Sequence, residues 1–404
     1  MQIPVVYTED YNYSLPQEKI AQHPLAERDS SKLLVFREGV CETTFYRQIA
    51  DYLPENSLVV FNNSKVIPAR ILYVKETSGV IELFCLEPLT GTPYEALQQH
   101  STSIWTCMIG GLKKWRKGSE LQWHLKQTDC IVNASLTGQN ENGFEVSFEW
   151  TDPDLTFADI LQQLGQMPIP PYLLRKADQE DAERYQTVYA TIEGSVAAPT
   201  AGLHFTSQII SSLKQKNIDL AYTTLHVGAG TFKPVNAALA RDHVMHAEWV
   251  EISREFVDQL SSSNQITCVG TTSLRTVESL YWYALHCIEE QALLSHDYVL
   301  PQFIAYENEE HVPKDIVFTK FHELLLKEHV ERILFKTELM ILPGYSMRVA
   351  SRLVTNFHQP KSTLLMLVNA FTKGKWKCVY EYALKNDYRF LSYGDGCLLE
   401  WEEK

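Results

Sequence analysis

Three segments of this 404-residue chain share one plan, in which a polar loop leads into a helix that starts at a Ser or a Thr. Two of them begin with a short apolar strand, over residues 266–270 and 352–357. In the third, the loop is 194–206 and a strand over 218–226 follows the helix. A hydroxyl side chain can cap each helix by accepting a hydrogen bond from its first turn. Strands that alternate with capped helices predict an α/β layer, in which ligands bind beyond the carboxyl ends of the strands.

Residues 70–150 follow a different pattern, with short runs of alternating apolar and polar residues separated by Gly, Asn and Ser turns. This spacing predicts a small antiparallel barrel or sandwich. Both flanks, 1–69 and 151–404, have the character of the α/β layer. We therefore expect a mixed α/β (α+β) main domain into which a small antiparallel β-barrel domain is inserted over 70–150.

Charge and cysteine content restrict the partners and the compartment. The formal net charge of −14 argues against general attraction to nucleic acid, so a polyanionic partner would need a local basic patch. No secretory signal is recognisable, and no apolar stretch reaches the ~18 residues that a membrane-spanning helix needs. The eight cysteines form no C-x-x-C motif, which is typical of reduced thiols. We expect a cytoplasmic protein that does not act at a membrane, and a monomer is compatible with these features.

The loop GSVAAPTAGLHFT (194–206) consists of small side chains and carries one titratable group, His204. Small residues let the backbone approach a ligand closely, so that its N–H groups can bind. The alternative is a tight buried connection with His204 as a core residue. An imidazole in so bare a loop is expected to keep a pKa near the working pH and to act as an acid or base. Comparable loop or strand-end positions make His226 and His358 candidates too.

LHVGAGTFKP (225–234) is a strand that ends in G-x-G. Many methyltransferases hold S-adenosylmethionine at such a turn, but here the third glycine is missing and no helix pattern follows at once. A plain loop turn explains these glycines equally well.

Two other segments, VGTTSLRT (269–276) and NFHQPKST (356–363), place hydroxyls and a cation at a predicted helix N-terminus. Free N–H groups and the positive end of the helix dipole suit a carboxylate or a phosphate there. Simple capping beside a surface cation is the alternative interpretation.

DHVMHAEW (242–249) carries His243, His246 and Glu248. An H-x-x-H pair can bind a metal ion, but no third ligand has a characteristic spacing. An ordinary polar face, or a hydrogen-bonding role for His246 and Glu248, is the preferred interpretation, and we expect no bound metal.

GGLKKWRKG (110–118), within the predicted β domain, gathers cations around Trp115. Cations that contact phosphates and a ring that stacks on a base suit RNA. A solvated hairpin turn is the alternative. The cations expected to contact RNA are Lys113, Lys114, Arg116 and Lys117.

Several long segments of unusual composition, spread over most of the chain, resemble one known family. They are IAQHPLAERDSSKLLV, LVVFNNSKVIPAR, IPPYLLR, ERYQTVYATIEGSVAAPTAGLHFT, TLHVGAGTFKPV, VGTTSLRTVES, PGYSMRVASRLVTNFHQPKSTLLMLV and YRFLSYGDG. The family that they resemble is the S-adenosylmethionine:tRNA ribosyltransferase-isomerases of queuosine biosynthesis.

This resemblance implies an enzyme that transfers the ribosyl group of S-adenosylmethionine to 7-aminomethyl-7-deazaguanine at the wobble position of tRNA. The ribosyl ring is isomerised to an epoxycyclopentane, which gives epoxyqueuosine, and adenine and methionine leave. S-Adenosylmethionine is then a co-substrate, no further cofactor is required, and tRNA carrying the deazaguanine is the partner. The residues expected to contact S-adenosylmethionine are Thr200, Gly202, Gly228, Gly230, Thr272, Ser273, Arg275, Lys361 and Ser362.

The chemistry of the co-substrate indicates what the protein must supply. Its sulfonium acidifies the adjacent 5′ carbon, so a positioned base can remove that proton. Its methionine carboxylate needs a cation or a helix N-terminus, for which Arg275 or Lys361 is suitable. Two alternatives stay open: a methyltransferase, which would yield S-adenosylhomocysteine, and a non-catalytic RNA-binding protein, which would bind tRNA without turnover.

Overall fold

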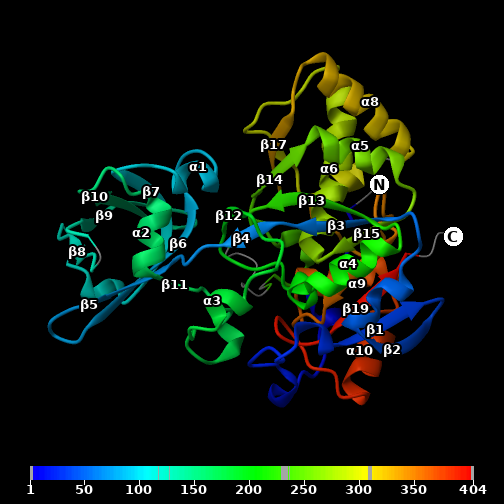
Figure 1. Ribbon diagram of the computed structural model, residues 1–404, viewed down its shortest axis with the longest axis horizontal. Coiled ribbons are helices and arrows are strands. Elements are labelled where there is room, and N and C mark those ends of the chain that lie inside the picture. Colours follow the sequence, from blue (N-terminus) through cyan, green and yellow to red (C-terminus); the bar gives the residue numbers. More distant parts are fainter. Residues whose placement is uncertain are drawn as a thin grey trace.

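A ten-stranded mixed sheet is the centre of the computed structural model (Figure 1), which describes residues 3–116, 118–126, 128–228, 235, 237–307 and 312–401. Its middle consists of parallel strands in the order β13 (Asp219–Leu225), β3 (Leu58–Asn62), β15 (Ile266–Val269) and β18 (Arg352–Asn356). Beyond β13 the order continues with β14 (Glu248–Ser253), β17 (Arg332–Thr337) and β16 (Val299–Leu300), and beyond β18 with β19 (Gly396–Glu400), β1 (Lys32–Arg37) and β2 (Val40–Phe45).

The helices of this sheet begin where the sequence predicts. Thr206 accepts a hydrogen bond from the Ile209 amide (3.3 Å), and Ser362 accepts one from the Leu365 amide (3.2 Å). The longest helix, α6, starts directly after Gly270, whose φ of 93° lies in the region that favours glycine. The helices are α3 (Asp181–Arg184), α4 (Ser207–Gln215), α5 (Arg254–Ser262), α6 (Thr271–Glu290), α7 (Ile304–Glu307), α8 (Lys314–Lys327), α9 (Thr363–Phe371) and α10 (Trp376–Lys385).

A second, seven-stranded antiparallel sheet curls into a half-barrel and lies to one side of the main sheet (Figure 1). It has a hydrophobic core of its own, to which Trp105, Phe148 and Phe157 belong. The short strands β4 (Ser64–Val66) and β12 (Ile192–Ser195) lie between the two sheets (Figure 1). Its elements are β5 (Arg70–Val74), β6 (Val80–Pro88), α1 (Pro93–Leu97), β7 (Thr102–Gly110), β8 (Leu121–His124), β9 (Ile131–Asn140), β10 (Gly143–Trp150), α2 (Phe157–Leu164) and β11 (Gly165–Gln166).

The predicted fold class, a mixed α/β body with a small antiparallel β unit, is confirmed. The bounds 70–150 for an inserted domain stay a prediction, since pairing in the second sheet continues to β11 and α2 packs into its core. Within the described residues, no helix is long and apolar enough to cross a membrane.

Candidate active site

A cleft opens at the carboxyl ends of the parallel strands, where this architecture places ligands. Val227 follows β13, Gly270 follows β15 and Phe357 follows β18, and all three line it. The loop 197–201 forms a further wall and is tied to β18 because Thr200 Oγ1 donates a hydrogen bond to Asn356 Oδ1 (2.7 Å). We call this space the strand-end compartment; its volume, including the part open to solvent, is about 880 Å³.

A second space of about 840 Å³, which we call the arginine compartment, adjoins the first. The two share part of their lining at the starts of α6 and α9. Its own walls carry the side chains of Glu248, Arg275 and His243. The residues common to both compartments are Thr271, Thr272, Ser362 and Leu364.

An ion pair in the arginine compartment is almost completely buried. Arg275 Nη1 donates to Glu248 Oε2 at 2.6 Å, and the two side chains are only 9% and 6% exposed. Arg275 Nε also donates to the carbonyl oxygen of Leu339 (3.2 Å), and Glu248 Oε1 accepts from the amide of Gly228 (3.2 Å). Arg275 Nη2 has no hydrogen-bond partner within the described part of the chain. Because a buried donor without a partner is costly, this atom marks a ligand position.

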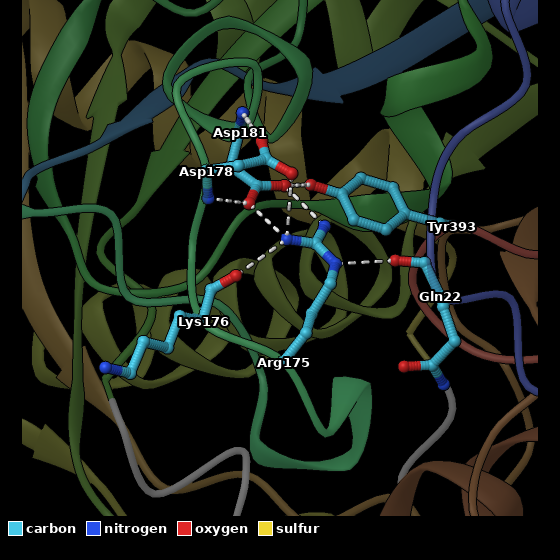
Figure 2. Close-up of polar contacts among 6 residues, drawn as sticks. All are labelled: Gln22, Arg175, Lys176, Asp178, Asp181 and Tyr393. Atoms are coloured by element: carbon cyan, nitrogen blue, oxygen red, sulfur yellow. Dashed lines mark hydrogen bonds and ion pairs between the residues drawn. The ribbon is translucent and has the colours of Figure 1, made fainter.

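A cluster around Arg175 fixes another wall of the cleft (Figure 2). Arg175 donates to both carboxylate oxygens of Asp181, from Nη1 at 2.6 Å and from Nη2 at 2.8 Å, and Tyr393 donates to the same carboxylate at 2.7 Å. Nearby, the hydroxyls of Tyr172 and Ser392 lie 2.6 Å apart, and both residues line the strand-end compartment. The cluster therefore binds the loop that carries Tyr172 to the C-terminal loop that carries Ser392.

Of the three candidate histidines, His358 lines the strand-end compartment. Its Nε2 lies 2.8 Å from Thr355 Oγ1, and its amide donates to the hydroxyl of Tyr380 (2.9 Å). Removal of the ring from water lowers its pKa to about 3. The imidazole is therefore neutral at the working pH.

His204 is buried beside the cleft rather than in its lining. Its ring stacks on Tyr46 with centroids 4.3 Å apart, and Nδ1 lies 3.3 Å from the carbonyl oxygen of Arg28. Burial lowers its pKa to about 4. The expected pKa near the working pH is wrong, because the loop is not only poor in charge but also removed from water.

His226 follows β13 but lines neither compartment. Its ring packs directly against Gly194, where a Cβ atom would collide with Nδ1. Burial lowers its pKa to about 4. A catalytic role for His204 or His226 stays a prediction.

The residues expected to contact S-adenosylmethionine divide into two groups. Gly202 and Ser273 face the packed interior, where Gly202 leaves room for the hydroxyl of Tyr189 and Ser273 donates to the carbonyl of Val269 (2.8 Å). Lys361 pairs with Glu9 at 2.6 Å and lines neither compartment, and Gly230 lies outside the described residues. The expected residues that do line the cleft are Thr200, Gly228, Thr272, Arg275 and Ser362.

The basic turn of the second sheet is exposed at Lys113, Lys114 and Arg116, whereas Lys117 lies outside the described residues. Lys75 adds a cation, because its Nζ contacts the carbonyl oxygen of Lys114. Trp115 is only 7% exposed and packs into the core of this sheet. The expectation that its ring stacks on a base is wrong, since an isolated turn pattern does not reveal which side chain points inward.

Two residues of the cleft were not predicted from the sequence. Tyr172 lies in MPIPPY, which looks like an extended linker, and Ser392 lies in YRFLSYGDG; only the long resemblance of IPPYLLR and YRFLSYGDG to one family could have drawn attention to them. His243 and His246 do line the arginine compartment. Among the residues that the structure describes, however, no group of three or more His, Cys, Asp or Glu could hold a metal ion.

An α/β body with a buried ion pair in a cleft at the strand ends, beside a β unit with a basic turn, defines an enzyme that acts on a small charged ligand. Comparisons with known proteins narrow this class. The family described as "Queuosine biosynthesis protein" matches residues 8–399. The chain belongs to this family.

Similar proteins include two named S-adenosylmethionine:tRNA ribosyltransferase-isomerase. The protein of Halothermothrix orenii is 36% identical over 399 residues, which are 97% of this chain and 99% of that protein. The protein of Legionella pneumophila strain Paris is 37% identical over 401 residues, again 97% and 99%. A solved structure, S-adenosylmethionine tRNA ribosyltransferase from Thermotoga maritima, has 28% identity and a TM-score of 0.45 over 96% of this chain and 99% of that one.

Proposed function

We propose that this chain is an S-adenosylmethionine:tRNA ribosyltransferase-isomerase that works in the two-compartment cleft. Its substrates are S-adenosylmethionine and tRNA that carries 7-aminomethyl-7-deazaguanine, and its products are epoxyqueuosine in tRNA, adenine and methionine. The observation that carries the proposal is the open Nη2 of Arg275, a buried cationic donor in a cleft at the strand ends. The full-length similarity to enzymes of this name supports it.

The cleft offers a place for the proton transfer that starts the reaction. His358 is the candidate base, because its neutral ring lines the strand-end compartment and can accept a proton from the carbon next to the sulfonium. His204 and His226 line neither compartment, so they would act through His358 or through the cleft wall. Thr200, Thr272 and Ser362 supply hydroxyls to a bound nucleoside.

The tRNA partner is held, in this proposal, by Lys113, Lys114 and Arg116, together with Lys117. Their exposed positions on the second sheet allow contact with phosphates in spite of the acidic net charge. A single chain supplies every lining residue of both compartments, which supports action as a monomer. The eight free cysteines support a cytoplasmic location.

The decisive experiment mixes the protein with S-adenosylmethionine and tRNA that carries the deazaguanine, and measures adenine by chromatography. Adenine and methionine should appear in equal amounts, and tRNA with unmodified guanine at the wobble position is the control substrate. Formation of S-adenosylhomocysteine would indicate a methyltransferase instead. Binding of tRNA without any turnover would indicate an RNA-binding protein.

A further inference from the structure

The ion pair in the arginine compartment has hydrogen-bonding capacity to spare on both partners. Arg275 donates from Nη1 and Nε, and its Nη2 is left open in the described part of the chain. Oε1 of Glu248 accepts from Gly228 and Oε2 accepts from Arg275, although a carboxylate oxygen can accept two hydrogen bonds. The pair therefore offers a donor and an acceptor side by side.

The start of α6 adds a second attraction for negative charge. This helix of 20 residues has no side-chain cap, so the amides of its first turn are not satisfied by the residue before it. Thr271 and Thr272 of this turn line both compartments, and Thr272 Oγ1 has no partner among the described atoms. A carboxylate close to Arg275 would thus also meet the positive end of a long helix.

The other walls of the arginine compartment are apolar. A hydrocarbon chain and a methyl group bound there would be removed from water, which favours binding. The side chains that form this surface are Met245, Leu339, Met340, Ile341 and Leu367.

We infer that Glu248 and Arg275 together recognise the free α-amino acid group of S-adenosylmethionine, with its carboxylate on Arg275 Nη2 and the start of α6 and its ammonium on Glu248. A zwitterion matches a buried pair of opposite charges without leaving a net charge uncompensated. The apolar walls then hold the methylene groups of methionine. The sulfonium and ribose lie where the compartments meet, and the adenine lies in the strand-end compartment. This inference rests on the proposed function, because it takes S-adenosylmethionine as the ligand.

One ligand comparison tests the inference on the unchanged protein. Affinities are measured by calorimetry for S-adenosylmethionine and for its analogue in which hydrogen replaces the α-ammonium group. We expect the analogue to bind about 30-fold more weakly or worse, since removal of one partner of a buried charged pair costs about 2 kcal/mol or more. Equal affinity for the two ligands would overturn the assignment of Glu248.

Variants then locate the effect. Glu248→Gln should weaken binding of S-adenosylmethionine about 30-fold or more and leave binding of the analogue nearly unchanged. Glu251→Gln is the matched control, because Glu251 lies on the same strand and pairs with Arg332 at 2.7 Å, outside the cleft. An equal loss for both ligands in Glu248→Gln would show a structural effect and overturn the inference.

The adenine-release assay distinguishes this inference from the proposed function. If the unchanged protein releases adenine but binds both ligands equally, the enzyme assignment stands and the amino-acid contact is wrong. If it neither binds S-adenosylmethionine nor releases adenine, the proposed function itself fails. Thermal melting of each variant shows whether it is folded, and the ligand comparison on the unchanged protein needs no variant.

Discussion

Replacement of Asp181 by Ala should destabilise the protein more than any other single change in the cluster of Figure 2. The Asp181 side chain is 2% exposed and accepts from Arg175 twice, from Tyr393 and from the amide of Asp178 (2.9 Å). Its removal leaves a guanidinium that is only 16% exposed without its main partner. Breaking a buried pair in this way costs about 3–5 kcal/mol. Because Arg175 keeps some exposure to water, we expect a value near the lower end, about 3 kcal/mol.

Urea unfolding monitored by tryptophan fluorescence measures this change, with two variants as references. Asp178→Ala removes a carboxylate that is 48% exposed and lies 3.3 Å from Arg175 Nη1, so a loss below about 1 kcal/mol is expected. Tyr393→Phe removes a single hydroxyl and should cost roughly 1–2 kcal/mol. A value for Asp181→Ala no larger than that for Asp178→Ala would refute the reasoning.

The same cluster should give a recognisable pH dependence. Burial raises the pKa of Asp181, but the hydrogen bonds from Arg175 and Tyr393 outweigh burial, and the pKa lies below its ordinary value. The ion pair therefore contributes its full stability above the ordinary aspartate pKa of about 3.9 and loses it as the pH falls through the lowered folded-state pKa. Asp181→Ala should lose this acid-dependent component. Activity should also suffer, as a higher KM for S-adenosylmethionine, because the cluster holds the wall that carries Tyr172.

Three further outcomes are expected. Neutralising Lys113, Lys114, Arg116 and Lys117 should weaken tRNA binding and flatten its salt dependence by about one log–log unit for each phosphate that the protein no longer neutralises; an unchanged salt slope would identify an idle surface turn. His358→Gln should lower single-turnover adenine release by roughly two to four orders of magnitude, and a rate close to that of the unchanged protein would remove His358 from the chemistry. Each histidine with a pKa lowered to about 4 should reduce the free energy of unfolding by about 1.4 kcal/mol per pH unit as the pH falls from about 6.5 to 4, because the unfolded chain takes up the proton first; His204→Gln should lessen that slope in urea titrations, and an unaltered slope would contradict the assignment.

Local rules were sufficient for the frame of the molecule. Hydroxyl caps at Thr206 and Ser362, the glycine before α6 and the alternating runs of the second sheet each depend on a few neighbouring residues, and all are found in the structure. The environment of His204 depends instead on Tyr46, which is distant in sequence. Composition predicted that its loop lacks charge, but only packing decides whether such a loop faces a ligand or the interior.

Arg275 and Lys361 show why the binding site needed the tertiary structure. Both are cations at the start of a helix, so the helix dipole favours an anion beside either one, and the sequence does not distinguish them. Their partners differ. Glu9, from the N-terminal segment, pairs with Lys361 outside the cleft, whereas Glu248, from β14, holds Arg275 by Nη1 and leaves Nη2 facing the arginine compartment. Removing the carboxylate of Glu9 would not make Lys361 a substitute, because Lys361 lines neither compartment. The acidic residue that each cation meets in the fold therefore decides which helix start can bind substrate.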